Sequence, residues 1–243
     1  MGKGLFITGT DTAVGKTFVA CSLAAYLREL GYHVGVMKPA ETGCVERDGE
    51  LFPEDAVRLK HAAGASEPIE KICPYRLPEP LAPSIAAERA GVKIDIDHLL
   101  AIYDEIRDQH DITLVEGAGG LMVPLLPSYT YADFAGVAKL PLIVVAANRL
   151  GMINHLLLTL EHASCKDLTI FGYVLNRTSG EASLAADTNR EVLAGLTGIS
   201  CLGELPFVDF GQRQDHFSLE AFEQEFDIRV IEPLLARKST WPK

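Results

Sequence analysis

Short apolar runs alternate with longer segments of mixed polarity along most of the chain. The short runs are rich in branched side chains, as strands of a buried parallel sheet are, and the longer segments repeat apolar residues with the period of a helix. The predicted strands cover residues 4–8, 33–37, 112–116, 142–146, 169–175 and 201–205. The predicted helices cover residues 17–30, 54–63, 97–108, 154–163 and 182–196. This order predicts an α/β fold of three layers, in which helices cover both faces of a mainly parallel sheet.

Two segments do not follow this alternation. Residues 74–83 hold four prolines, each of which lacks an N–H donor and restricts the residue before it, so we expect an extended or turning surface loop. Residues 219–235 have the pattern of a closing helix. With 243 residues, of which 48% are hydrophobic, the chain can bury one substantial core, and we expect a single domain over residues 1–243.

The sequence GTDTAVGKT at residues 9–17 has the composition of a phosphate-binding loop between a strand and a helix. Backbone N–H groups and the helix N-terminus in such a loop hold a polyphosphate, Lys16 reaches the outer phosphates, and the hydroxyl of Thr17 ligates Mg²⁺. Five residues separate Gly9 from Gly15, one more than in the usual pattern, so the loop is a variant. We therefore predict a P-loop NTPase-type fold that handles a nucleoside triphosphate.

Carboxylates are expected beside Thr17, because Mg²⁺ prefers hard oxygen ligands. Glu116 ends a predicted strand at the carboxyl edge of the sheet, where parallel sheets bind ligands. The alternative for Glu116 is a solvated acid at the end of a strand. The sequence GAGG follows at residues 117–120, and backbone without side chains suits the close approach of a ligand. Asp55 opens a predicted helix, where the helix dipole alone also explains an acid.

Lys38 ends the second predicted strand, which we expect to lie beside the first strand and therefore near the phosphate site. A cation there can stabilise the charge of a transferring phosphoryl group, although a lysine at the end of a strand is also often solvated. Thr42 follows in the polar turn at residues 39–43, which suits the presentation of its hydroxyl to a ligand.

Two later strand ends carry further polar groups. Asn176 follows the predicted strand 169–175, where its amide could either read the Watson–Crick edge of adenine or cap a turn. Residues 150–155 follow another strand and open a helix, whose first N–H groups could hold an anion. His155 fits a structural role better than that of a general base, because no cysteine or aspartate is close to it in the sequence.

The formal net charge of −11 indicates that the protein does not bind nucleic acid, which requires a surface rich in lysine and arginine. The five cysteines are odd in number and form no C-x-x-C pair, so we expect neither a disulfide framework nor a zinc site, and we expect a reducing, cytoplasmic location. No apolar run reaches the roughly 18 residues of a membrane span, and no membrane association is expected.

These features together resemble the dethiobiotin synthetase family, from the N-terminus to about residue 210. The motifs that carry the resemblance are GTDTAVGKT at 9–17, Lys38-Pro39, Thr42-Gly43, Asp55, VEGAGG at 115–120, Gly151 with Ile153-Asn154-His155, and Asn176. The spacing of the P-loop and the EGAGG run are specific in combination. The resemblance implies a P-loop α/β fold, ATP as co-substrate with Mg²⁺, 7,8-diaminononanoate (diaminopelargonate) and CO₂ as the other substrates, and a homodimer whose active site lies at the subunit interface. The implied reaction closes the ureido ring of dethiobiotin through a carbamate and a carbamic–phosphoric mixed anhydride.

The same resemblance implies a role for each matching residue. Lys38, Lys16 and Thr12 would be catalytic, and the metal ion would be surrounded by Thr17, Asp55 and Glu116. The substrate would contact Thr42 and Gly119 of one subunit and Leu150, Gly151 and Asn154 of the other. The nucleotide would contact Ala13, Val14, Gly15, Lys16, Thr17, Phe18, Asp55, Glu116, Gly117, Ala118, Gly119, Asn176, Arg177, Pro206, Phe207 and Val208.

Some positions depart from the pattern of the family. Thr42 stands where serine is common, which keeps the hydroxyl, and Leu121 stands where an aromatic residue occurs. Residues 209–216 do not align position by position, so a nucleotide contact in that segment is left unassigned.

Two other classes of protein share the P-loop fold. Ligases that amidate cobyrinic acid carry an added glutaminase domain, for which we expect no room in 243 residues. Chromosome-partitioning ATPases usually carry an extra lysine early in the loop, where this sequence has Thr10, Asp11 and Thr12.

Overall fold

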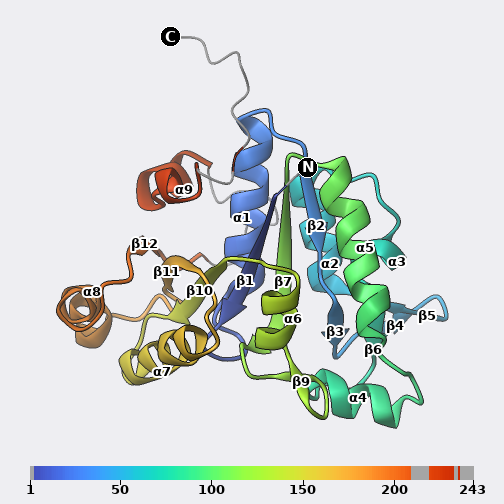
Figure 1. Ribbon diagram of the computed structural model, residues 1–243. Helices are drawn as coiled ribbons and strands as arrows, with labels where there is room; N and C mark the ends of the chain where they lie inside the picture. Colours follow the sequence, from blue (N-terminus) through green and yellow to red (C-terminus); the bar gives the residue numbers. More distant parts are fainter. Residues whose placement is uncertain (1–2, 209–218, 233–234, 236–243) are drawn as a thin grey trace.

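The computed structural model describes residues 3–208, 219–232 and 235 of the chain. Its centre is a parallel sheet with the strand order β12-β11-β10-β1-β7-β2 (Figure 1). The strands are β1 Lys3–Gly9, β2 Val34–Met37, β7 Ile112–Gly120, β10 Leu142–Ala147, β11 Ile170–Asn176 and β12 Cys201–Leu205. All of the predicted strands are therefore confirmed, and the sheet is parallel as expected.

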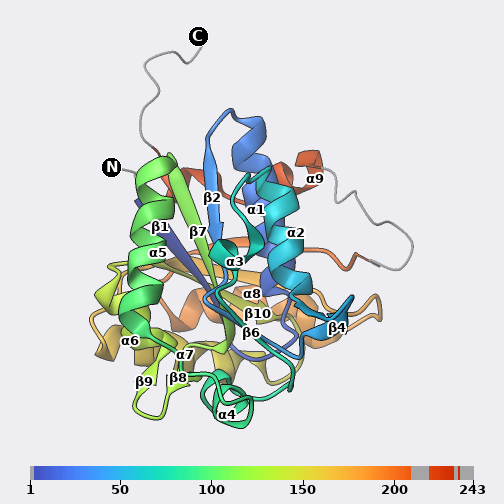
Figure 2. The same cartoon turned by 90° about the vertical axis from the view of Figure 1, so that its right-hand side faces the viewer.

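Alternate side chains of the central strand β1 face opposite sides of the sheet. Leu5 and Ile7 pack into a core with the helices α1 (Lys16–Glu29) and α2 (Glu54–Ala63), whereas Phe6 packs with α5 (Ile96–Gln109) and α6 (Tyr131–Val137). Figure 2 shows α5 on one side of the strands and α1 with α2 on the other. One face carries α1 Lys16–Glu29, α2 Glu54–Ala63 and α9 Leu219–Glu225, and the other carries α5 Ile96–Gln109, α6 Tyr131–Val137, α7 Met152–Cys165 and α8 Leu184–Leu196. The three layers and the predicted helices are confirmed, and α2 has the predicted ends.

The position of β2 differs from the expectation. We expected the second strand beside the first, but β7 pairs with β1 on one edge and with β2 on the other. Local sequence patterns carry no signal for this order, because each strand of a parallel sheet is buried and apolar on both faces. Lys38 therefore lies one strand further from the P-loop than expected, and its long side chain reaches back to Glu116 within β7.

β7 also continues past its predicted end at Glu116, through the glycine run at residues 117–120. Gly120 lies opposite Gly9, and a Cβ atom on Gly120 would lie 3.3 Å from the carbonyl oxygen of Gly9. The glycine run is predicted to allow a ligand to approach closely. At Gly120 the close neighbour is the backbone of the P-loop.

The prediction of a loop at residues 74–83 is wrong in part. β6 Tyr75–Leu77 lies between two prolines and pairs in parallel with β3 Ala40–Thr42, and Leu77 is fully buried. Pro83 occupies the first turn of α4 Pro83–Arg89, where its missing N–H donor costs no helical hydrogen bond. Pro74, Pro78 and Pro83 therefore mark the ends of short elements.

The predicted closing helix is wrong beyond Glu225, where α9 ends. Phe226 leaves the helix and forms a bridge with Gly203 of β12, and the N–H of Asp227 donates to the backbone of β12 at 2.6 Å. The rings of Phe222 and Phe226 are both buried and stack with centroids 4.8 Å apart. Burial of the second ring beside β12 favours this turn over a longer helix.

Other short elements had no prediction. They are α3 Ile69–Ile72, the helix α6 on one face of the sheet, the hairpin of β4 Val45–Arg47 and β5 Glu50–Phe52, the pair of β8 Pro124–Leu126 and β9 Tyr129–Thr130, and a 3₁₀ turn at Ile228–Val230. Among the described residues, no helix combines the length and the apolar character that a membrane span requires.

Candidate active site

The loop between β1 and α1 has the backbone geometry of an anion-binding loop. Gly15 adopts the left-handed conformation, with φ +93°, at the N-terminus of α1, and a Cβ atom there would collide with the amide of Asn176. No side chain of the described ranges caps α1, so the N–H groups of its first turn are left for an anion. The Nζ atom of Lys16 donates to the carbonyl oxygen of Asp11 at 3.0 Å. Burial lowers the pKa of Lys16 to about 8, against an opposing attraction from Glu116.

Four side chains from four elements meet next to this loop. The Nζ atom of Lys38 lies 2.7 Å from Oε1 of Glu116 and 2.9 Å from Oδ2 of Asp55. The hydroxyl of Thr17 donates to the same Oε1 atom at 2.7 Å. Lys38 and Glu116 are only 3% and 1% exposed. The fold therefore brings together Lys38 after β2, Glu116 in β7, Asp55 in α2 and Thr17 in α1, as the sequence predicts.

The two carboxylates keep Lys38 charged in this buried position. Burial alone would lower the pKa of the Lys38 ammonium, but attraction by Glu116 and Asp55 raises it above its usual range. Burial would likewise raise the pKa of the Asp55 carboxyl, but Lys38 lowers it below its usual value. Lys38 and Asp55 are both charged at neutral pH. Asp55, whose side chain is 36% exposed, offsets part of the cost of burying Lys38.

Glu41 is a residue of this site that the sequence analysis missed. Its buried carboxylate accepts the backbone N–H groups of Asp55 and Ala56 at 3.0 Å each. It thereby caps the N-terminus of α2, for which the preceding Pro53 supplies no side-chain cap. Sequence rules look for a cap immediately before the helix, whereas this one comes from β3, so no local signal could have identified it.

The oxygen atoms of Thr17, Asp55 and Glu116 fit a hard divalent cation such as Mg²⁺. The second carboxylate oxygen of Glu116, Oε2, is buried and has no hydrogen-bond partner in the described part of the chain. A buried oxygen of this kind is usually satisfied by an ion or a water molecule. In the same part of the chain no three His, Cys, Asp or Glu side chains are placed so that together they could hold a metal ion, so a cation here would use the hydroxyl as well as the two carboxylates.

Asn176, at the end of β11, contacts the P-loop. Its Nδ2 atom donates to the carbonyl oxygen of Val14 at 2.9 Å. Its Oδ1 atom is buried and has no partner within residues 3–208 or the other described positions. The donor of this amide thus holds the loop, and its acceptor is left for an N–H group such as the exocyclic amine of adenine.

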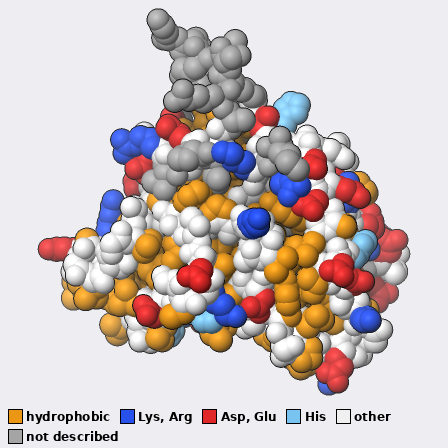
Figure 3. All heavy atoms as spheres, viewed as in Figure 1, with side chains coloured by type: hydrophobic (Ala, Val, Ile, Leu, Met, Phe, Trp, Pro, Cys, Tyr) orange, Lys and Arg blue, Asp and Glu red, His pale blue; other side chains and the backbone are white. Residues whose placement is uncertain are grey.

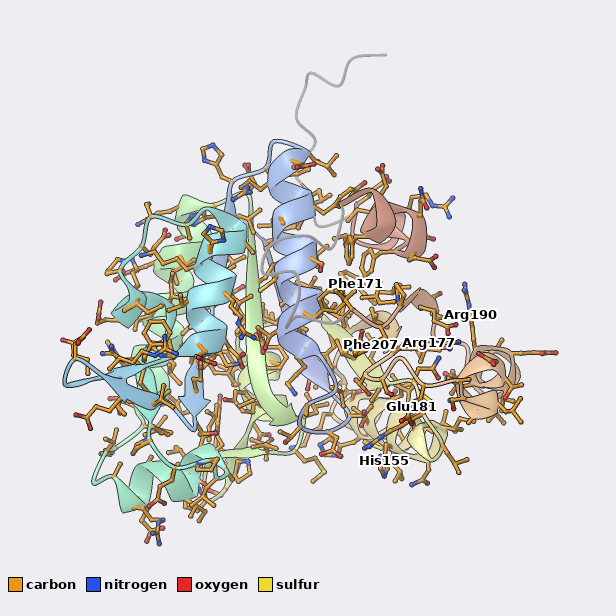
Figure 4. All side chains as sticks on the ribbon, turned by 180° about the vertical axis from the view of Figure 1, so that it is seen from behind. His155, Phe171, Arg177, Glu181, Arg190 and Phe207 are labelled. Atoms are coloured by element: carbon orange, nitrogen blue, oxygen red, sulfur yellow. The ribbon has the colours of Figure 1, made fainter. Side chains whose placement is uncertain are left out.

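The segment expected to hold the adenine continues from the ends of β11 and β12. Asn176 pairs in register with Leu205, and beyond Leu205 the side chains of Pro206 and Phe207 are exposed, whereas Val208 is half-buried. A Cβ atom on Gly180 would lie 3.1 Å from the Phe207 ring. Figure 4 shows Phe207 and Arg177 in this region, with His155 at the start of α7.

Arg177 has partners within the protein. Its Nη2 atom lies 2.7 Å from Asp187 Oδ1 and 3.2 Å from Glu204 Oε1. These ion pairs connect β11 with α8 and β12, so Arg177 holds three elements together. A contact of Arg177 with the nucleotide stays a prediction.

The remaining residues expected around the nucleotide lie along the P-loop and at the end of β7. Ala13 has a left-handed backbone, with φ +56°, and Phe18 packs half-buried against the core. A Cβ atom on Gly117 would lie 2.9 Å from the ring of Phe6, so packing alone requires this glycine, and Ala118 beside it is half-buried. Their contacts with a nucleotide stay predictions.

The residues expected to bind the substrate fall into two groups. In the first group, Gly119 faces Thr12, because a Cβ atom on Gly119 would lie 3.7 Å from the Thr12 hydroxyl. Thr42 is half-buried at the end of β3.

The second group is Leu150, Gly151 and Asn154, which are exposed at the N-terminus of α7. No hydrogen bond or ion pair among the described residues joins this group to the side chains around Lys38. The structure therefore does not bring the second group into the same cluster within one subunit.

A parallel sheet whose first strand runs into a P-loop, with two carboxylates and a second lysine beside that loop, defines a P-loop nucleotide-binding protein of the three-layer α/β class. The family described as AAA domain matches residues 3–211. The cell division ATPase MinD of Pyrococcus furiosus has a TM-score of 0.57 and 16% identity, over 96% of this chain and 100% of that chain. Cobyrinic acid a,c-diamide synthase from Mycobacterium smegmatis has a TM-score of 0.56 and 14% identity, over 98% and 96%. At such identities the likeness shows the fold alone.

Sequence relatives narrow this class to one family. The ATP-dependent dethiobiotin synthetase BioD of Bacillus cereus strain G9842 is 39% identical over 237 residues, which are 98% of this chain and 96% of that protein. The protein of the same name from Anaeromyxobacter dehalogenans strain 2CP-C is 44% identical over 205 residues, 84% of this chain and 90% of that protein. The chain belongs to the dethiobiotin synthetase family, a family of ATP-dependent ligases of biotin biosynthesis, and the resemblance in the sequence is confirmed.

Proposed function

We propose that this protein forms dethiobiotin from 7,8-diaminononanoate, CO₂ and ATP, with release of ADP and phosphate. The observation that carries the proposal is the meeting of Lys38, Thr17, Asp55 and Glu116 beside the P-loop in a chain of this family. Two lysines and a set of hard oxygen donors at a phosphate-binding loop suit the transfer of a phosphoryl group.

In the proposed reaction an amine of the substrate adds to CO₂ and loses a proton, which gives a carbamate. A carbamate oxygen attacks the γ-phosphorus of ATP, the bond to the β-phosphate oxygen breaks, and a carbamic–phosphoric mixed anhydride and ADP form. The second amine attacks the carbonyl carbon, the carbon–oxygen bond to phosphate breaks, and the ring closes with loss of another proton. Because the protein forms no covalent bond, positioning and charge stabilisation supply the catalysis.

Lys16 and Lys38 are the proposed stabilisers of the phosphoryl charge. Lys16 and the N–H groups at the start of α1 bind the β- and γ-phosphates. The carboxylates of Asp55 and Glu116 keep Lys38 positively charged although it is buried, and this charge stabilises the negative charge of the transferring phosphoryl group. The hydroxyl of Thr12, which belongs to the P-loop and lies near Gly119 of β7, would also contact the transferring group.

Thr17, Asp55 and Glu116 are the proposed ligands of Mg²⁺. The buried Oε2 atom of Glu116 without a partner in the described residues supports this assignment, and Glu41 orients Asp55 through the first turn of α2. When bound, Mg²⁺ would neutralise part of the phosphate charge of ATP.

Asn176 is the proposed reader of the base. Its Oδ1 atom would accept the exocyclic amine of adenine, while its Nδ2 atom stays on the carbonyl of Val14. The adenine would pack against Pro206, Phe207 and Val208 at the ends of the neighbouring strands.

A second copy of the chain is proposed to complete the active site. The carboxylate of the diamine is several methylenes away from the reacting amines, so it must be held away from Lys38. The N-terminus of α7 at Leu150, Gly151 and Asn154 suits a carboxylate, and Thr42 and Gly119 would contact the diamine in the other subunit.

The surface around α7 supports such a dimer. Leu150 and Leu158 are 86% and 62% exposed, and Figure 3 shows hydrophobic side chains gathered at the surface in the lower part of the molecule, where Figure 1 has α7. Exposed apolar side chains that cluster in this way mark an interface with another protein surface.

A product assay tests the proposed function. The purified protein should form dethiobiotin and ADP in equal amounts only when the diamine, bicarbonate, Mg²⁺ and ATP are all present. Lys16→Ala should form neither product, since the outer phosphates lose their cation. ATP turnover at the same rate without the diamine, with no ring product, would contradict the proposal.

A further inference from the structure

The ammonium of Lys38 lies where the proposed ligands of Mg²⁺ meet. It donates to Asp55 and to Glu116, and the Glu116 oxygen that it contacts also accepts the hydroxyl of Thr17. In this structure the positive charge beside Thr17, Asp55 and Glu116 is therefore the ammonium of Lys38.

Burial makes a cation at this point necessary. The side chains of Lys38 and Glu116 are 4% and 1% exposed, so Glu116 has lost nearly all of its hydration. Without a cation between them, Glu116 would repel the neighbouring carboxylate of Asp55, whose side chain is 36% exposed. Glu41 adds a third acid beside Asp55. The other lysine of the site, Lys16, donates to a carbonyl of the P-loop and to neither carboxylate.

We propose that Lys38 is the resident counter-ion of the metal site. In the free protein its ammonium neutralises Asp55 and Glu116 and keeps divalent cations out. When ATP enters with Mg²⁺, the phosphates become the partners of the ammonium and the carboxylates become available to the cation. The inference rests on the metal site of the proposed function. Its consequence is an order of binding, in which Mg²⁺ enters with the nucleotide and not before it.

The dependence of thermal stability on Mg²⁺, without nucleotide, tests this order. Lys38→Met keeps the aliphatic stem and removes the charge, so the unfolding midpoint should fall, and saturating Mg²⁺ should raise it again by about 5 °C or more, because a ligand that binds only the folded state stabilises it. The wild-type midpoint should not respond to Mg²⁺ until a non-hydrolysable ATP analogue is added.

Lys166→Met is the matched control. Lys166 also makes an ion pair of 2.8 Å, with Asp133, but its side chain is 44% exposed and lies outside the site. The midpoint of this variant should not respond to Mg²⁺. A wild-type midpoint that rises with Mg²⁺ alone, as much as that of Lys38→Met, would overturn the inference.

The affinity for Mn²⁺, measured from the loss of the EPR signal of the free ion, is a second test of the inference. Without nucleotide, Lys38→Met should bind Mn²⁺ at least about tenfold more tightly than the wild type, by the removal of one competing charge, and Lys38→Met/Glu116→Gln should lose this gain. Equal Mn²⁺ affinity in the wild type and Lys38→Met would overturn the inference. If Lys38→Met does not fold, the wild type alone decides. Tight binding of Mn²⁺ to the wild type without nucleotide would contradict a resident counter-ion. Weak binding that becomes tighter when the ATP analogue is added would support a resident counter-ion. None of these readings depends on dethiobiotin formation, so the inference and the proposed function can fail separately.

Discussion

The backbone N–H of Asp55 donates to Oε1 of Glu41 at 3.0 Å, and the N–H of Ala56 donates to Oε2 at the same distance. The carboxylate of Glu41 thus fixes the first turn of α2, which carries a proposed metal ligand. Lys38 and Glu41 belong to one short segment that leaves β2 and forms β3. This segment therefore supplies both the buried lysine of the site and the group that orients its carboxylate partner.

Glu41→Gln should weaken the binding of MgATP more than it slows catalysis. The amide has one acceptor oxygen and turns an NH₂ group toward the second N–H donor of α2. A buried donor without a partner costs about 1–3 kcal/mol, so we expect KM for MgATP to rise about tenfold and kcat to change less than about threefold. Steady-state kinetics at saturating diamine measure both constants.

Glu46→Gln is the control for this prediction, because Glu46 is an exposed acid of the neighbouring hairpin. A lower unfolding midpoint of Glu41→Gln with unchanged KM would show that Glu41 stabilises α2 without orienting Asp55.

Lys38→Met should lower kcat about a hundredfold or more, the range for the loss of one preorganised charge donor. KM for ATP should change much less, because Lys16 and the N–H groups of the P-loop still hold the phosphates. Turnover at saturating substrates measures the effect, with Lys166→Met as the control. A turnover rate equal to that of the wild type would remove Lys38 from the mechanism.

Gly151→Val should raise KM for the diamine strongly and leave ATP binding nearly intact. Gly151 has φ +89°, and nothing in the described residues lies within 4 Å of its Cβ position, so the new side chain would stand in the proposed path of the carboxylate. Gly49→Val is the matched control, because Gly49 has φ +82° and equally open surroundings and carries the same backbone strain in the β4–β5 turn. An equal effect of both substitutions would leave only strain as the explanation.

The same variant tests the proposed dimer. Gly151→Val mixed with Lys16→Ala should regain activity, because a heterodimer has one site with an intact P-loop and an intact α7 segment from the partner. If the mixture stays inactive although mass spectrometry confirms subunit exchange, the segment serves its own subunit or binds no substrate.

Asp133 should make stability depend on pH between about pH 4 and pH 2. Burial opposes ionisation, but hydrogen bonds from Lys166 and Thr130 lower the pKa of Asp133 from the ordinary 3.8 to about 2. Since the folded pKa lies below the unfolded one, the stabilisation is complete above about pH 4 and is lost as the pH falls toward 2. The pKa shift alone corresponds to a stabilisation of about 2 kcal/mol. Because Lys166 is exposed to solvent, we expect a stabilisation of about 1 kcal/mol.

Urea unfolding of the wild type and Asp133→Asn measures this contribution. The free energies of unfolding should differ by about 1 kcal/mol at neutral pH and converge as the pH approaches 2. A difference that stays constant down to pH 3 would exclude the titration of Asp133 as its cause.

The P-loop and the ends of α2 could be predicted from the sequence, because their signals are local. Residues 9–17 carry glycines, a lysine and a hydroxyl at a recognisable spacing. α2 is bounded by Pro53 and by Gly64, which has φ +64° at the C-cap. Local backbone preferences therefore decide both features before any packing is considered.

The strand order and the role of Glu41 could not be predicted, because they depend on segments far apart in the sequence. The insertion of β7 between β1 and β2 follows from the packing of buried strands whose patterns are alike. The helical pattern of residues 219–235 is overridden beyond Glu225, where Phe226 pairs with β12. The unassigned contact at residues 209–216 lies outside the described residues, and the single domain over residues 1–243 stays a prediction.

The transfer of an oxygen atom from CO₂ to phosphate would show that a carbamate oxygen attacks the γ-phosphorus at the site of Lys16 and Lys38. The reaction is started with ¹⁸O-labelled CO₂ and stopped before the label exchanges with water, and the phosphate is analysed by mass spectrometry. We predict phosphate that carries one ¹⁸O atom for each dethiobiotin formed, because ring closure breaks the carbon–oxygen bond of the mixed anhydride. Unlabelled phosphate, formed together with dethiobiotin, would contradict it.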